Sequence, residues 1–191
     1  MTQPILVAYA TNHGHTRLIA ERIGAVLREA GQQVELCDLG SDSSDARPVD
    51  YAGVVVAASV HAGHHQSKAV HWSRVHAAAL NALPTAFLSV SLTAADDSDE
   101  ARAATRELID EVSDDSGWTP TVTLPVAGAL QYREYDFPTR VLMRLIAHRH
   151  HQPTDVSSDV DYTDWAAVER FATDFAARVG TAAADGPPIR S

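Results

Sequence analysis

Short apolar runs that alternate with longer polar or amphipathic stretches are the feature that most constrains the fold of this chain. The runs span residues 5–10, 33–39, 53–58, 85–91 and 121–127. Those at 5–10 and 53–58 are continuous, which is typical of strands buried on both faces of a sheet. Strands that alternate with helices favour a parallel sheet with right-handed crossovers, so we expect an α/β fold.

The stretches between these runs carry apolar residues at helical spacing. In the first of them apolar residues repeat from Ile19 to Ala30, and Gly31 is a suitable helix stop. The acidic segment 41–50 is expected to form a loop or a short irregular helix. Further helices are expected at residues 66–80, 96–113 and 163–179. Residues 128–162 form a long insertion before the last helix, and long insertions in compact domains often carry function.

Length and charge limit the class of protein. The chain has 191 residues, which suits one core, and we expect a single domain over residues 1–180 with a flexible tail at 181–191. A net charge of −10 argues against general nucleic-acid binding, because phosphates require a basic face. Cys37 is the only cysteine, so no internal disulfide is possible. With no membrane-spanning run and no signal-peptide pattern, we expect a cytoplasmic protein.

A polar loop lies between the first strand and the first helix. Its sequence is Thr11-Asn12-His13-Gly14-His15-Thr16. In an open parallel sheet, ligands bind beyond the carboxyl ends of the strands, and a helix N-terminus suits a phosphate. Gly14 permits close approach, while Thr11 and Thr16 add hydroxyl donors. The loop matches neither the nucleoside-triphosphate pattern nor G-x-G-x-x-G. The alternative is structural: Thr11 or Asn12 simply caps the helix.

Four further stretches accompany that loop along the chain. They are SVHAGHH from Ser59, SVSL from Ser89, VAGALQYREY from Val126 and YTDW from Tyr162. Together with the T-x-x-G-x-T loop, they resemble the flavodoxin family over nearly the whole chain, to about residue 179. A closer resemblance is to the branch of menaquinone-dependent protoporphyrinogen oxidases. AGALQY, followed by an insertion and then YTDW, is the most specific part of this resemblance.

The resemblance implies a doubly wound, flavodoxin-like five-stranded parallel sheet of order 2-1-3-4-5, with the insertion at 128–162 after strand 5. It also implies an FMN enzyme of haem biosynthesis that oxidises protoporphyrinogen IX to protoporphyrin IX and passes electrons to menaquinone. Matched by motif, the cofactor-binding residues are Thr11, Asn12, His13, Gly14, His15, Thr16, Ser59, Val60, His61, Ala62, Gly63, His64, Ser89, Val90, Ser91, Leu92, Gly128, Ala129 and Leu130.

The histidines of these motifs lead to further expectations. The cofactor carries the chemistry, so no catalytic residue is assigned, and His61 and His64 are the candidates beside the flavin ring. His13 and His15 lie in the phosphate loop, so FMN retention is expected to change between about pH 5 and pH 8. The histidine-rich stretches 61–65 and 148–151 lack the ligand spacing of a known metal site, and we expect no metal.

Residues 136–151 form a basic, amphipathic segment in an otherwise acidic chain. Arg140, Arg144 and His148 fall on one helical stripe beside an apolar face. Together with Tyr132, this stripe is expected to contact the substrate's carboxylates or an anionic lipid surface on the inner face of the cell membrane. The alternative is that the apolar face covers one end of the core and the arginines are merely solvated.

Two other functions use the same fold and stay open at this point. A flavodoxin-type electron carrier for a protein partner fits the net charge of −10 but leaves the basic insertion without a role. An NAD(P)H-dependent quinone reductase would reduce its flavin from a different donor. The fold alone does not separate these classes. The sequence is compatible with a homo-oligomer.

Replacing Arg140 and Arg144 together with Glu is expected to weaken binding to anionic vesicles by roughly tenfold or more. The reason is that each basic residue near such a surface contributes about 1 kcal/mol. If the stripe binds substrate instead, the porphyrinogen concentration needed for half-saturation rises. Vesicle co-sedimentation and substrate titration measure the two effects. Unchanged vesicle binding together with unchanged saturation would remove both functional interpretations of the stripe.

Overall fold

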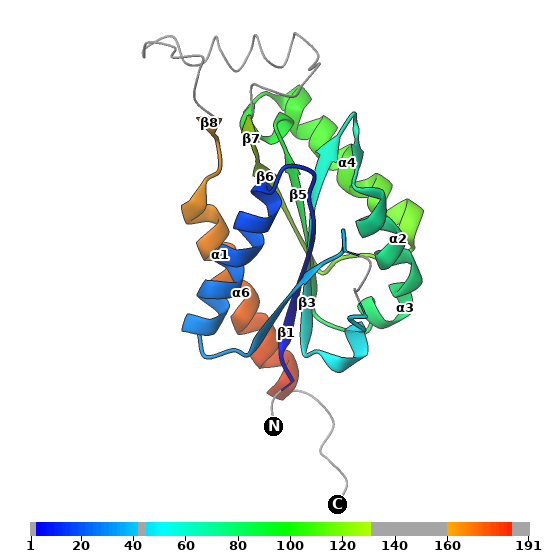
Figure 1. Cartoon of the computed structure of the whole chain (residues 1–191), viewed down its shortest axis with the longest axis vertical. Helices are drawn as coiled ribbons and strands as arrows, with labels where there is room; N and C mark the ends of the chain where they lie inside the picture. Colours follow the sequence, from blue (N-terminus) through cyan, green and yellow to red (C-terminus); the bar gives the residue numbers. More distant parts are fainter. Residues whose placement is uncertain (1–2, 42–44, 131–159, 185–191) are drawn as a thin grey trace, which may run out of the picture.

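The computed structural model describes residues 3–41, 45–130 and 160–184. A twisted parallel sheet lies between two layers of helices (Figure 1). Its order is β2-β1-β3-β5-β6, which confirms the expected order of five strands, because the additional strand β4 (His64–His65) is only a short hairpin arm. The five strands are β1 (Ile5–Ala10), β2 (Val34–Asp38), β3 (Gly53–His61), β5 (Thr85–Ser91) and β6 (Val122–Ala127).

Helices cover both faces of the sheet (Figure 1). One face carries α1 (His15–Glu29) and α6 (Trp165–Ala184). The other face carries α2 (Ser67–Val75), α3 (Ala77–Leu80) and α4 (Asp99–Ser116). Two short 3-10 helices, η1 (Pro48–Asp50) and η2 (Thr93–Ala95), lie in the connections. Within the described ranges, no helix is long and apolar enough to cross a membrane.

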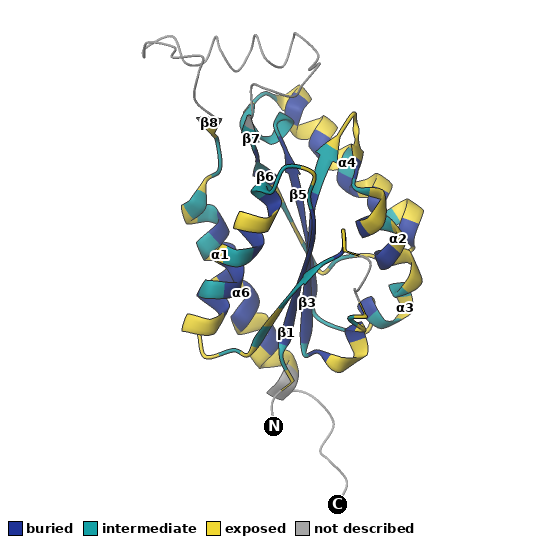
Figure 2. Cartoon of the chain, viewed as in Figure 1, coloured by how far each residue is buried: buried dark blue, intermediate teal, exposed yellow. Residues whose placement is uncertain are grey.

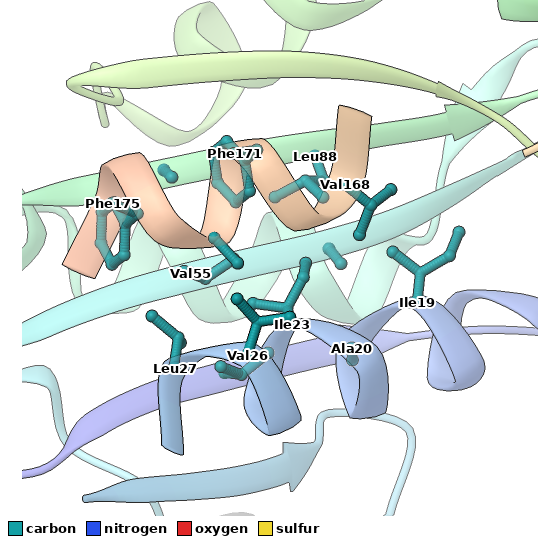
Figure 3. Packing of buried hydrophobic residues seen from close by; sticks show 14 of the residues in the cluster. Ile19, Ala20, Ile23, Val26, Leu27, Val55, Leu88, Val168, Phe171 and Phe175 are labelled. Carbon is teal, nitrogen blue, oxygen red and sulfur yellow. The ribbon is translucent and has the colours of Figure 1, made fainter. Parts of the chain in front are cut away.

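Burial of the central strands on both faces explains their continuous apolar sequence. All six residues of β1 are buried, and the central strands are the darkest part of the molecule in Figure 2. On the first face, α1 and α6 pack their apolar sides against the sheet and against each other (Figure 3). This cluster includes Ile19, Ile23, Leu27, Phe171 and Phe175.

The second face contains the larger aromatic side chains. Trp118 is fully buried, and its ring meets Phe87 edge-on with centroids 5.9 Å apart. The Trp118 Nε1–H donates to Thr85 Oγ1 at 3.1 Å, as a buried indole requires. Trp72 from α2 and Ile109 from α4 complete this layer.

The single helix expected at 66–80 is wrong, because the structure divides it into α2 and α3 at His76. There the backbone leaves the helical region, with φ −107° and ψ 11°. The imidazole packs on Trp72 at a centroid distance of 4.9 Å. The His76 carbonyl then accepts hydrogen bonds from the N–H groups of Ala79 and Leu80, at 3.0 and 2.9 Å, which begins the next helix.

Two other helices differ from expectation at their ends. The helix expected at 96–113 lies at 99–116, because Ser98 is its N-cap and accepts from the Ala101 N–H at 3.2 Å. Asp96 instead accepts from the Ser98 N–H at 2.9 Å, so it belongs to the preceding turn. The last helix continues to Ala184, so residues 181–184 are helical, although we expected them to belong to the tail.

β3 is longer than expected and returns as a hairpin. It extends to His61 and pairs antiparallel with β4. Ala62 and Gly63 form the turn with φ of +51° and +85°. Positive φ at both central residues is what a tight hairpin turn of the favoured hand requires.

The expected insertion leaves the sheet directly after β6. It begins at β7 (Ala129–Leu130) and returns at β8 (Val160–Asp161), and these two strands pair antiparallel. Residues 131–159, which include the basic segment expected at 136–151, lie outside the described residues.

Gly53→Ala is expected to destabilise the fold by about 1–3 kcal/mol, because overpacking forces neighbouring groups to move. A Cβ at this position would lie 2.7 Å from Val179 Cγ2 and 3.2 Å from the Pro84 carbonyl oxygen. Gly180→Ala is the matched control: its Cβ meets nothing within 4 Å, and alanine in a helix is favoured by about 0.5–1 kcal/mol. Urea unfolding measures both, and a Gly53→Ala variant as stable as the parent would contradict this packing.

Candidate functional site

A pocket opens at the carboxyl ends of the central strands. The strand order reverses beside β1, because the chain turns from β1 to β2 on one side and places β3 on the other. Such a switch point is where open α/β sheets bind ligands. All of the lining residues belong to the set predicted from the motifs. They are Thr11, Asn12, His13, His15, Thr16, Ser59, Val60, His61, Val90, Ser91, Leu92, Gly128 and Ala129.

The loop after β1 has the geometry of an anion-binding loop. Gly14 has φ +84°, which glycine adopts without strain, and its N–H donates to Thr11 Oγ1 at 3.0 Å. The proposed capping role of Thr11 or Asn12 is wrong, because Gly14 is the N-cap and α1 has no side-chain cap. The first N–H groups of α1 and the positive end of its dipole are therefore available to a phosphate.

Two hydroxyl groups in the pocket wall are buried and have no hydrogen-bond partner in the described part of the chain. They are Thr16 Oγ1 in the first turn of α1 and Ser59 Oγ near the end of β3. A buried hydroxyl without a partner costs about 1–3 kcal/mol. A polar ligand in the pocket would supply these hydrogen bonds and offset that cost. Together with the apolar walls formed by Val60, Val90 and Leu92, these groups fit a ligand such as FMN.

His15 is held by residues near the other end of the chain. Its Nε2 lies 2.7 Å from the Thr163 hydroxyl, which itself donates to the Ala127 carbonyl at 2.8 Å. The Trp165 ring packs edge-on against the His15 ring, with centroids 6.0 Å apart. Burial lowers the pKa of His15, and the Asp161 carboxylate offsets this only in part. The ring is therefore neutral at pH 7, and any pH dependence that it confers shifts to more acidic solution.

Asp161 organises the chain as it returns from the insertion. Its carboxylate oxygens accept from the Thr163 N–H and the Trp165 Nε1–H, each at 2.9 Å. Burial raises the pKa of Asp161, but these hydrogen bonds and the neighbouring His15 outweigh burial, so the pKa lies below its usual value. The carboxylate is ionised at neutral pH and lies 3.5 Å from His15 Nε2.

Sequence reasoning missed the roles of Thr163 and Asp161; Thr163 belongs to the YTDW motif, and Asp161 immediately precedes it. Within that motif, the Tyr162 N–H donates to the Gly128 carbonyl at 3.4 Å. Asp164 caps α6 by accepting from the Ala167 N–H at 2.9 Å. Each residue of the motif therefore attaches the returning chain to the pocket edge or begins the last helix.

The two proton-transfer candidates lie in different surroundings. His61 lines the pocket, where its ring centroid is 6.4 Å from that of His13. His64 lies outside the lining, its side chain is 80% exposed, and its Nδ1 is 3.9 Å from Glu111 Oε2. Of the two candidates, the structure brings His61 to the pocket and leaves His64 on the surface beside α4.

Several predicted cofactor residues lie outside the pocket lining. Ala62 and Gly63 form the hairpin turn. Ser89 is fully buried, and its hydroxyl lies 2.9 Å from His65 Nε2. Burial, with a smaller contribution from His64, lowers the pKa of His65 to about 4, so this imidazole is a neutral core residue. Gly14 supports the loop from the N-cap position, and Leu130 belongs to β7.

The remaining predicted contacts lie outside the described residues. They are Tyr132, Arg140, Arg144 and His148. In the part of the chain that the structure describes, no group of three or more His, Cys, Asp or Glu side chains is placed to hold a metal ion.

The pocket lies at the switch point of a doubly wound sheet, and the uncapped start of α1, which follows a glycine-containing loop, forms part of its wall. This arrangement defines a flavodoxin-type α/β protein. A family model described as a flavodoxin domain matches residues 6–157, and the chain belongs to this family. The oxidised flavodoxin 1 of Bacillus cereus shares the fold, with a TM-score of 0.54 and 14% identity over 90% of this chain and 96% of that one.

Two curated relatives carry one name, protoporphyrinogen IX dehydrogenase (quinone). The protein of Leishmania major is 36% identical over 173 residues, which cover 90% of this chain and 74% of that protein. The protein of Escherichia coli strain K12 is 32% identical over 171 residues, which cover 90% of this chain and 93% of that protein. Both levels of the resemblance stated from the sequence are therefore confirmed, the flavodoxin family and its protoporphyrinogen-oxidising branch.

Acidification from about pH 6.5 to pH 4 is expected to destabilise the protein through His65. Its folded-state pKa of about 4 lies below the ordinary value of 6.5, so the unfolded chain binds the extra proton in this window. The contribution of His65 to the free energy of unfolding is full above pH 6.5. It falls by roughly 3 kcal/mol as the pH approaches 4, and it is constant below that pH.

Unfolding free energies measured across this range should show a shallower slope for His65→Gln than for the parent. His71→Gln, at an exposed position on α2, is the control and should keep the parental slope. Parallel slopes for the parent and His65→Gln would contradict a neutral, buried His65.

Proposed function

We propose that this chain binds FMN, oxidises protoporphyrinogen IX to protoporphyrin IX and passes the electrons to menaquinone. The observation that carries the proposal is the pair of buried, unpartnered hydroxyls, Thr16 and Ser59, in a pocket at the uncapped start of α1. The relatives in Leishmania major and Escherichia coli, named as protoporphyrinogen IX dehydrogenases that use a quinone, support the substrate class and the acceptor.

The phosphate of FMN would be held by the loop after β1. The N–H groups at the start of α1, the Thr16 hydroxyl and the backbone near Gly14 supply donors and close approach there. Among the residues that the structure describes, the lining contains no lysine or arginine and His15 is neutral, so these residues would hold the phosphate by hydrogen bonds and the helix dipole. Val60, Val90 and Leu92 would hold the ring system by apolar contact.

Bound FMN would supply the redox chemistry between the porphyrinogen and the quinone. The residues of the chain would bind and orient the reacting partners and keep water away from them. His61, on the pocket wall, is the side chain proposed to take up or release protons at its imidazole nitrogens. His64 is no longer proposed for this role, because it lies on the surface away from the pocket.

The basic segment at 136–151 is proposed to meet the substrate's propionates or the membrane where the quinone resides. Its arginines suit carboxylates and anionic headgroups alike. The chain departs toward this segment from β7 and returns at β8, which pairs with β7, and Ala129 of β7 lines the pocket; this supports the proposal.

The test is an anaerobic reaction of the FMN-loaded protein with protoporphyrinogen IX. Rapid bleaching of the flavin band, reversed by a menaquinone analogue with porphyrin fluorescence appearing, is the expected result. A flavin that porphyrinogen leaves oxidised contradicts the proposal and favours an electron carrier. Bleaching by NAD(P)H instead identifies a quinone reductase with another electron donor.

Thr16→Val is expected to weaken FMN binding by about three- to tenfold, since it removes one hydrogen-bonding group. The same variant should be at least as stable as the parent without FMN, because it removes an unpartnered buried hydroxyl. Ser73→Ala removes another unpartnered buried hydroxyl, in α2 and outside the pocket, and should leave FMN affinity unchanged. Equal losses of FMN affinity in both variants would mean that the effect is not local to the pocket.

A further inference from the structure

The two chain segments that border residues 131–159 are hydrogen-bonded to the wall of the pocket. On the outgoing side, the Gly128 N–H donates to the Ser91 carbonyl at 3.1 Å, and both residues line the pocket. On the returning side, the Tyr162 N–H donates to the Gly128 carbonyl at 3.4 Å. The Thr163 hydroxyl donates to the Ala127 carbonyl at 2.8 Å and lies 2.7 Å from Nε2 of His15, which lines the pocket. We call β7, β8 and Thr163 together the insertion base.

The hydrogen bonds around the Thr163 hydroxyl favour one tautomer of the His15 ring. This hydroxyl lies 2.8 Å from the Ala127 carbonyl, to which it can donate, and 2.7 Å from His15 Nε2. When its single proton is donated to the Ala127 carbonyl, the oxygen accepts a proton from Nε2. In the neutral ring, Nδ1 is then the acceptor. The Asp161 carboxylate, 3.5 Å from Nε2, favours the same tautomer.

Asp161 and Trp165 restrict the ring further. Asp161 accepts from the backbone of Thr163 and from the indole of Trp165, so its position is set by both. The indole in turn meets the His15 ring edge-on. Because His15 is the first residue of α1 and lines the pocket, its partners act on the helix end where the phosphate would bind.

We propose that Thr163, Asp161 and Trp165 are positioning residues that couple the insertion base, through His15, to the start of α1 and so to FMN. The inference rests on the proposed function, because it takes FMN as the ligand at that helix end. None of these three residues is among those that line the pocket, whereas His15, which all three approach, does line it. By linkage, FMN stabilises the insertion base by the same factor by which the base strengthens FMN binding.

The first measurement uses the protein without FMN. Nitrogen-15 NMR of the imidazoles at pH 7 is expected to show His15 as the Nε2–H tautomer. Thr163→Val removes the acceptor and should produce a mixture of tautomers, and Thr163→Ser should restore the single tautomer. An Nδ1–H tautomer in the parent, or no change in Thr163→Val, overturns the proposal, because the coupling depends on this hydrogen bond.

The second measurement is FMN affinity by flavin-fluorescence titration of the full chain. Thr163→Val should weaken binding about three- to tenfold, as for one lost hydrogen bond, and Thr163→Ser should recover it. Thr173→Val is the matched control, since it removes a hydroxyl that bonds the Glu169 carbonyl at 3.0 Å on an exposed part of α6. Asp161→Asn, at an exposed position, should give a smaller loss and does not disturb the core.

The double variant His15→Ala with Thr163→Val distinguishes an effect of Thr163 that acts through His15 from a general loss of structure. If Thr163 acts through His15, the double variant binds FMN no more weakly than His15→Ala alone, whereas additive losses overturn the proposal. Unchanged affinity in both Thr163→Val and Asp161→Asn also overturns it. If the parent itself fails to bind saturating FMN, the proposed function falls and this coupling with it. The tautomer measurement then still shows whether the hydrogen-bond network exists.

Discussion

The parallel pairing of β1 with β3 is the interaction on which the rest of the structure depends. The register joins Ile5 to Gly53 and continues to Ala10 and Ala58, so β1 ends beside Ala58 while β3 continues to His61. From β1 the chain passes through α1 to β2 on one side of the sheet, while from β3 it passes through α2 and α3 to β5 on the other. The two loops therefore diverge at the carboxyl edge, and the pocket opens between them.

Polar groups at this pocket are arranged differently from most of those in the core. In the core, the Trp118 indole bonds Thr85, and His65 lies at hydrogen-bond distance from Ser89, so these buried polar groups are satisfied within the fold. Thr16 and Ser59 keep buried hydroxyls that have no partner among the residues the structure describes. Ser73 shows that such a hydroxyl also occurs away from the pocket, so this feature alone does not mark a site. What distinguishes the pocket from the surroundings of Ser73 is the uncapped start of α1 beside Thr16.

The insertion makes a second demand on the same edge. Residues 131–159 separate β7 from β8 beside the pocket. Bringing the two ends of such a long loop together costs conformational entropy, so contacts at its ends help to hold the pocket edge in place. The structure meets this demand with a two-stranded pair and with the hydroxyl of Thr163, which joins β6 to the start of α1. Hydrogen bonding of this kind connects the outermost strand of the sheet to a helix on its face.

Local sequence was sufficient for the strands, most of the helices and the identity of the pocket-lining loops. Apolar runs and helical spacing depend on near neighbours, and the carboxyl ends of parallel strands must meet at one edge, so the motifs after β1, β3 and β5 were predictable as one site. The tertiary structure decided which members of each motif face the pocket. Ser89 and Val90 are adjacent, yet the first contacts His65 and the second lines the pocket, because side chains alternate along a strand. It also decided that His15 meets Thr163, 148 residues away, since that contact exists only when α1 and α6 lie on the same face of the finished sheet.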